Sequence, residues 1–194
     1  MRILTGNSLR ANCRLIFADT NQIKPFFMSI TLYIARHAKA EDRAVFMPDF
    51  DRKLTSEGVM AAARMGRFLK GKGILPEAVI SSPAPRASET AKVIAEQIGY
   101  DLGQIEFNEK LYEGGPKAYL ASINALPATV QSAMIVGHNP DVSYLAEFLT
   151  HQSIGSMSKG AVVAVTFEDA AWAEIAGRTG NVAFTIAPKQ LKNE

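Results

Sequence analysis

Short apolar runs alternate with longer segments of mixed polarity along the chain from about residue 31 onward. Three of these runs have the length and character of buried strands, at residues 32–35, 78–80 and 134–136, and a further short strand is predicted around residues 105–107. They are separated by stretches long enough to hold a helix. This alternation predicts a sheet built from strand–helix–strand units.

The segments between the runs carry apolar residues at helical spacing. Thr55 is placed to cap a helix whose apolar positions 61, 65, 68 and 69 follow an i, i+4, i+7, i+8 pattern, and Gly71 ends it. Pro85 opens a second helix, which Gly99 closes. Pro116 is placed to start a third helix, through residue 123, and residues 139–141 open a fourth that continues to about residue 149.

In the carboxyl-terminal part of the chain, the apolar segments follow one another without helical segments between them. Residues 161–167, 171–175 and 182–186 are interpreted as short strands of an antiparallel unit. Together with the earlier elements, they predict an α/β fold: a mixed, mostly parallel sheet flanked by helices, with antiparallel strands near the carboxyl terminus.

Composition excludes only a few classes of partner and location. The 194 residues carry a net charge of +2, which favours neither nucleic acid nor an anionic membrane as a partner. The chain has no run of about 18 apolar residues, which is the length that a transmembrane helix needs. The one cysteine, Cys13, cannot form an internal disulfide, and this favours a reducing compartment and a cytoplasmic location.

Residues 1–27 differ from the rest of the chain. Their basic residues are scattered, no compact apolar segment marks a secretory signal, and the first acidic residue is Asp19, as in some transit peptides. We interpret residues 1–27 as a disordered extension or a start-site artefact, because Met28 leads directly into the first strand. Residues 28–194 are then the single functional domain.

Basic side chains follow three of the predicted strands. Arg36 and His37 come directly after the first, Arg86 lies six residues beyond the second, and His138 follows the strand at 134–136. In an open α/β sheet, ligand sites gather at the carboxyl ends of the strands, so these four residues could share one pocket. Guanidinium groups match phosphate oxygens, and the pocket would therefore suit a phosphoryl group.

The same residues suggest a reaction. A neutral imidazole at His37 could attack phosphorus and divide a hydrolysis into two steps. Arg36 and Arg86 would stabilise the charge on the phosphoryl oxygens, and His138, if protonated, would donate a further hydrogen bond. Such a site needs no metal or other cofactor, and the chain has no zinc-like cluster. Taken singly, each of these residues would be read as structural; only their joint position at strand ends favours the phosphate site.

These segments resemble the histidine phosphatase superfamily, which is phosphoglycerate mutase-like and has an Arg-His dipeptide at the end of its first strand. The resemblance is carried by residues 32–38, 51–58, 81–91 and 137–140, and the pattern is most similar to SixA-type phosphohistidine phosphatases. It implies a three-layer fold, His37 as the phosphoryl acceptor, and Arg36, Arg86 and His138 as the rest of the phosphate pocket. Ala38 stands where the wider superfamily commonly has glycine.

Two further site residues are predicted with alternatives. Arg52 lies in a segment resembling the SixA-type pattern and could reach the phosphate or the substrate, or it could be a surface arginine paired with Asp49 and Asp51. Glu113 resembles the glutamate that protonates the leaving group in many superfamily members, with Glu109 as its rival.

The length of the segment between two predicted strands bears on the size of the substrate. Residues 108–132 must supply one helix and its connections, which leaves little for a lid and predicts an open, shallow cleft. An open cleft suits a phosphorylated protein, such as a phosphohistidine-carrying domain, better than a small phosphoester. The alternatives are a phosphatase of small phosphoesters, a phosphoglycerate-mutase-like transferase and a non-catalytic phosphate-binding module.

Overall fold

The computed structural model describes residues 29–43 and 45–191. The predicted extension at residues 1–27 lies outside the described residues. Within the described part, no helix has the length and apolar character needed to cross a membrane.

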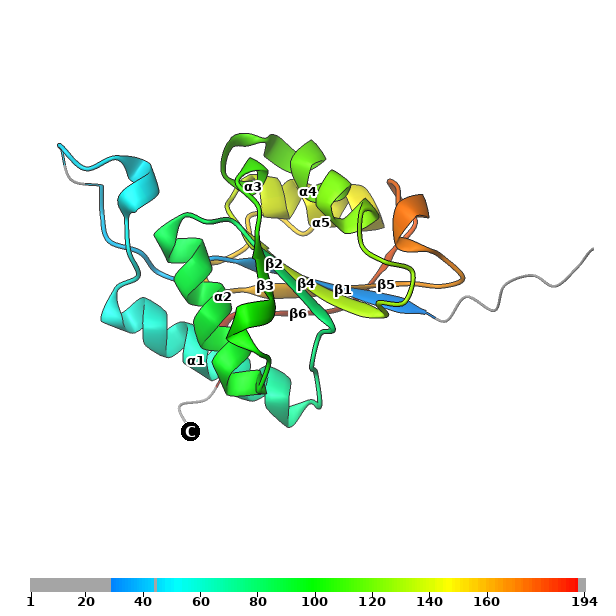
Figure 1. Cartoon of the computed structure of the whole chain (residues 1–194), viewed down its shortest axis with the longest axis horizontal. Helices are drawn as coiled ribbons and strands as arrows, with labels where there is room; N and C mark the ends of the chain where they lie inside the picture. Colours follow the sequence, from blue (N-terminus) through cyan, green and yellow to red (C-terminus); the bar gives the residue numbers. More distant parts are fainter. Residues whose placement is uncertain (1–28, 44, 192–194) are drawn as a thin grey trace, which may run out of the picture.

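Six strands form one sheet in the order β3-β2-β4-β1-β5-β6 (Figure 1). Neighbours from β3 to β1 run parallel, whereas β5 is antiparallel to both β1 and β6. This confirms the predicted mixed, mostly parallel sheet with antiparallel carboxyl-terminal strands. The strands are β1 (Ile30–Arg36), β2 (Ala78–Ser81), β3 (Ile105–Phe107), β4 (Ser132–Gly137), β5 (Val162–Phe167) and β6 (Asn181–Ile186).

Helices cover both faces of the sheet, so the fold has three layers (Figure 1). On one face α1 packs against α2, and on the other α3, α4 and α5 gather. The helices of the described residues are α1 (Ser56–Gly71), α2 (Pro85–Ile98), α3 (Lys110–Glu113), α4 (Gly115–Asn124) and α5 (Asp141–Thr150). The same part of the chain has the 3₁₀ turns η1 (Asp49–Asp51), η2 (Leu102–Gln104), η3 (Trp172–Glu174) and η4 (Pro188–Gln190).

The sheet has a hydrophobic core on each face, and alternate residues of the central strands belong to one core or the other. Leu32 and Ile34 of β1 belong to the core under α4 and α5, whereas Ala35 joins Val79 and Met134 in the core under α1 and α2. Successive side chains of a strand point to opposite faces, and both faces here are covered, so the strands read as nearly continuous apolar runs.

The predicted helix ends agree with the structure. The Thr55 side chain caps α1 by accepting a hydrogen bond from the Gly58 N–H at 3.1 Å. Pro85 occupies the first turn of α2, and Gly99 ends that helix with φ 84°, a conformation that glycine adopts easily.

The predicted strand at residues 171–175 is wrong, because this segment contains the 3₁₀ turn η3. Trp172 and Ile175 are both buried although they lie three residues apart, and this spacing fits a 3₁₀ turn better than a strand of period two. The Trp172 indole also donates a hydrogen bond to the Val130 carbonyl at 2.6 Å, which holds the turn against the start of β4.

Candidate active site

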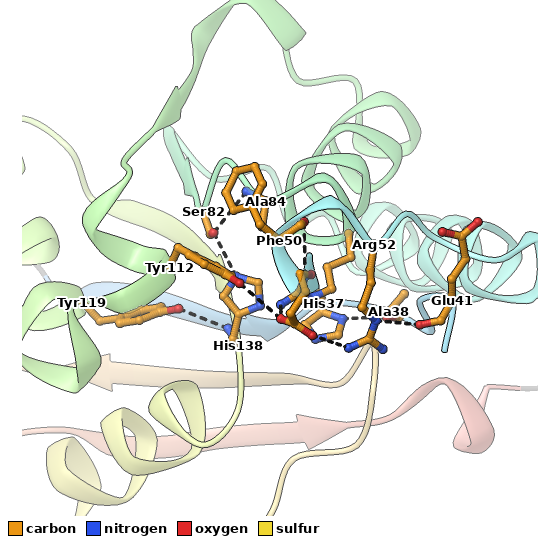
Figure 2. Close-up of polar contacts among 12 residues, drawn as sticks. His37, Ala38, Glu41, Phe50, Arg52, Ser82, Ala84, Tyr112, Tyr119 and His138 are labelled. Carbon is orange, nitrogen blue, oxygen red and sulfur yellow. Dashed lines mark hydrogen bonds and ion pairs between the residues drawn. The ribbon is translucent and has the colours of Figure 1, made fainter. Parts of the chain in front are cut away.

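The two histidines lie at the carboxyl ends of the neighbouring parallel strands β1 and β4. The His37 N–H donates to the Gly137 carbonyl at 2.9 Å, and this backbone bond sets the two strand ends side by side. The imidazole rings of His37 and His138 have centroids 5.2 Å apart (Figure 2). Each residue is only 7% exposed, so their chemistry takes place in a largely dry environment.

One nitrogen of the His37 ring is held by the backbone. Nδ1 lies 2.8 Å from the Ala38 carbonyl oxygen, which only accepts hydrogen bonds, so Nδ1 carries the proton. Burial lowers the pKa of His37 to about 4, and the positive charges of Arg86 and Arg36 act in the same direction, against the Ala38 hydrogen bond. At neutral pH the ring is therefore uncharged, with the lone pair on Nε2.

The two predicted arginines reach the same region from different elements. Arg36 ends β1 and donates from Nη1 to the Met157 carbonyl at 2.6 Å. Arg86, in the first turn of α2, donates from Nη2 to a carboxylate oxygen of Asp49 at 2.7 Å and from Nη1 to the Asp49 carbonyl at 2.5 Å. The Nε atoms of both arginines are buried and have no hydrogen-bond partner within the described residues.

Arg52 joins this group through the same aspartate. Its Nη1 lies 2.8 Å from Asp49 Oδ1, and its Nε donates to the Glu41 carbonyl at 2.7 Å. The charge of Arg52 also contributes to the lowered pKa of His37. Arg52 is thus paired with Asp49, as one alternative expected, whereas no pairing with Asp51 is seen among the described residues; its reach to a phosphate stays a prediction.

The His138 ring is oriented by Ser82, which follows β2. Ser82 Oγ lies 2.9 Å from His138 Nε2 and also accepts the Ala84 N–H at 3.3 Å. Since the oxygen already accepts from Ala84, its own hydrogen can be donated to Nε2, which leaves the ring proton on Nδ1. His138 Nδ1 is buried and has no partner among the described residues, so it can donate to a bound anion.

His138 is neutral in this arrangement. Its pKa is lowered to about 3, chiefly by burial and in addition by the nearby His37 and Arg86. The sequence predicted a donor through protonation; the Ser82 contact favours an uncharged Nδ1–H donor instead, and the donor role itself stays a prediction.

A tyrosine fixes the backbone of His138. The Tyr119 hydroxyl accepts the His138 N–H at 3.1 Å and donates to the Leu111 carbonyl at 2.7 Å. A side chain at Gly137 would overlap this hydroxyl, so the close approach requires glycine there.

Two aromatic side chains, which the sequence analysis did not predict as site residues, border the site. The Tyr112 ring packs edge-on against Phe50 and His138 (Figure 2), with centroid distances of 5.0 and 5.5 Å. Its hydroxyl lies 3.3 Å from Asp49 Oδ2. Tyr112 stands next to the predicted Glu113, and Phe50 next to Asp49. Neither segment has a periodic pattern that would have indicated which side chain faces inward.

The role of Glu113 stays a prediction. Glu113 and its rival Glu109 are exposed, and within the described residues no hydrogen bond or ion pair of either carboxylate is seen. Nor does any group of three or more potential metal-ligating side chains occur in the part of the chain that is described.

Comparisons with known proteins agree with this geometry. A family model described as the histidine phosphatase superfamily (branch 1) matches residues 32–117, which include His37 and Arg86. An uncharacterized protein of Picosynechococcus is 30% identical over 168 residues, which cover 82% of this chain and 98% of that protein.

Solved structures extend the likeness over most of the chain. The protein histidine phosphatase SixA, complexed with tungstate, superposes with a TM-score of 0.73 and 25% identity, over 84% of this chain and 100% of SixA. A phosphoglycerate mutase from Bacillus anthracis shares the fold, with a TM-score of 0.55 and 19% identity over 74% of this chain and 90% of that chain.

The fold and the site thus define a phosphatase. The chain belongs to the histidine phosphatase superfamily, and its structural neighbours include a SixA phosphohistidine phosphatase.

Proposed function

We propose that the protein is a metal-independent phosphatase that forms a phosphohistidine intermediate on His37 and acts on phosphohistidine in another protein. One observation carries the proposal: the Nδ1–H of His37 is directed to the Ala38 carbonyl, so the uncharged Nε2 is available beside Arg86 and His138. A neutral imidazole with a fixed tautomer is a competent nucleophile towards phosphorus.

The reaction divides into two displacements. His37 Nε2 attacks the phosphorus, a new P–N bond forms, and the bond between phosphorus and the substrate imidazole breaks, with the leaving imidazole taking a proton from solvent. Water then attacks the phosphorus, the bond to Nε2 breaks, and orthophosphate leaves after the water has given up a proton to solvent. Arg36, Arg86 and Arg52 stabilise the charge on the phosphoryl oxygens in both steps, and His138 Nδ1 donates to them.

A protein substrate is supported by two features. The SixA to which the chain is similar is a protein histidine phosphatase. In addition, the segment between β3 and β4 is occupied by the short helices α3 and α4, which leaves no long insertion for enclosing a small molecule. For a phosphoester substrate, whose leaving oxygen needs a proton, Glu113 stays the predicted donor.

The first experiment compares substrates with one metal-free preparation. Hydrolysis of a phosphohistidine protein is measured beside a panel of small phosphoesters, with His37→Ala and the exposed His151→Ala as a matched pair. We expect a preference for phosphohistidine that is lost in His37→Ala and kept in His151→Ala. Better turnover of small phosphoesters would move the function towards general metabolism, and an active His37→Ala variant would remove His37 as the nucleophile.

Reactions stopped with an alkaline denaturant separate a phosphatase from a binding module. With a labelled phosphoryl donor, wild-type protein should retain label that is stable in base and lost in acid, as expected for phosphohistidine, and His37→Ala should retain none. Transfer to a phosphoglycerate acceptor would favour the mutase-like alternative. A cytoplasmic location also stays a prediction, which cell fractionation would check.

A further inference from the structure

A carboxylate from the chain itself occupies the donors of the phosphate site. Asp49 Oδ2 accepts from Arg86 Nη2 at 2.7 Å and from the Tyr112 hydroxyl at 3.3 Å, and Oδ1 accepts from Arg52 Nη1 at 2.8 Å. The Asp49 carbonyl accepts from Arg86 Nη1 at 2.5 Å. Asp49 therefore contacts both terminal nitrogens of Arg86 and one nitrogen of Arg52.

These are the donors that a phosphoryl group needs. An arginine binds a carboxylate and a phosphate with the same forked face, so the two anions compete for it. Arg86 keeps only Nε without a partner among the described residues. A phosphoryl dianion that bound Nη2 of Arg86, together with the free Nε, would have to displace the Asp49 carboxylate, since two anions cannot share these donors without repulsion.

The position of Asp49 allows it to leave. It begins η1, a single 3₁₀ turn with no buried residue, in the connection between β1 and α1. Its side chain is 38% exposed, whereas that of Arg86 is 5% exposed. The base of the connection is held separately by the bridge between Ala40 and Leu54. The carboxylate can therefore swing into solvent while the arginines keep their places.

We propose that Asp49 is an internal competitor of phosphate: it occupies Arg86 and Arg52 in the free enzyme, is displaced by the substrate's phosphoryl group, and returns when orthophosphate leaves. The inference rests on the proposed function and deepens it. Asp49 weakens the binding of every phosphoryl group, but a protein substrate has further contacts that offset the loss, whereas free orthophosphate has none. Asp49 therefore selects for a phosphoprotein and against retention of the product.

The test measures oxyanion binding, which does not depend on turnover. Binding of inorganic phosphate and of tungstate is measured by calorimetry for wild type, Asp49→Asn, Asp49→Glu and Asp51→Asn. Asp51 is the matched control, because it lies in the same turn and is exposed. We expect the dissociation constant of phosphate to be about tenfold lower for Asp49→Asn than for wild type. Asp49→Glu and Asp51→Asn should bind as wild type does.

Unchanged or weaker binding by Asp49→Asn would overturn the proposal and make Asp49 a residue that holds the arginines in place. If the asparagine variant does not fold, wild-type protein answers the same question by NMR. On addition of phosphate, the Asp49 side-chain carboxyl resonance should move as its arginine contacts are lost, and an unmoved resonance would refute displacement. Failure of the proposed function shows itself differently, as phosphate binding without hydrolysis.

Discussion

The Ser82 hydroxyl lies 2.9 Å from Nε2 of His138, and the same oxygen accepts the Ala84 N–H. This pair determines which nitrogen of a buried, uncharged imidazole carries the proton. With Nε2 held as an acceptor, Nδ1–H is the remaining donor, so a neutral His138 can stabilise the phosphoryl oxygens throughout the physiological pH range.

Ser82→Ala should therefore reduce activity without removing any group that touches phosphate. Loss of the hydroxyl releases His138 to the other tautomer, and we expect kcat/KM to fall about tenfold, the size of one hydrogen bond in a dry site. Nitrogen-15 NMR of His138 should show the proton moving from Nδ1 towards Nε2. Ser82→Thr, which keeps the hydroxyl, should retain the wild-type spectrum and rate. An unchanged His138 spectrum in Ser82→Ala would contradict the assignment.

Glu113→Gln should leave phosphohistidine hydrolysis within about twofold of wild type. A protonated imidazole leaves readily, and the exposed Glu113 carboxylate makes no hydrogen bond or ion pair with the described residues. Glu109→Gln, the exposed neighbour, is the control. The same variants are then assayed with alkyl phosphates, whose leaving oxygen needs a proton. A tenfold loss confined to Glu113→Gln and to these esters would make Glu113 the proton donor for phosphoesters, and a comparable loss on phosphohistidine would contradict the prediction.

The arrangement of the strands was predictable from sequence, whereas the connections between them were not. Arg36 and His37 follow one apolar run and His138 another, and parallel strands end at one edge of a sheet, so their proximity follows from the pattern. Asp49 and Tyr112 lie on connections without periodicity, and only the course of the folded chain brings them to Arg86. The tautomer of His138 likewise depends on Ser82, 56 residues away in sequence.

Gly137→Ala should destabilise the protein and lower its activity together. The new methyl group would overlap the Tyr119 hydroxyl, which holds the backbone of His138, and we expect a loss of about 1–3 kcal/mol in the free energy of unfolding. Denaturant unfolding measures the loss. Gly71→Ala is the control, because a methyl group there meets nothing within 4 Å at the end of α1 and should raise stability by about 0.5–1 kcal/mol. Equal stability of the two variants would show that the Tyr119 contact is unimportant.

The buried histidines make stability depend on pH in a definite direction. The pKa of His37 is lowered to about 4 and that of His138 to about 3, whereas an unfolded histidine titrates near 6.5. Between these values the unfolded chain binds protons that the folded protein excludes, so acid favours unfolding. The free energy of unfolding should therefore fall as the pH drops from about 6.5 to 4, by an amount on the order of several kcal/mol for the pair.

Two measurements check this dependence. Urea unfolding followed at a series of pH values gives the slope, and a His37→Gln/His138→Gln double variant should show a flatter profile over the same range because it lacks both titrating groups. In wild-type protein, the ring resonances of His37 and His138 should stay unmoved between pH 8 and 5. A titration of either ring near 6.5 would contradict the assignment of neutral rings, and with it the free Nε2 lone pair on which attack by His37 depends.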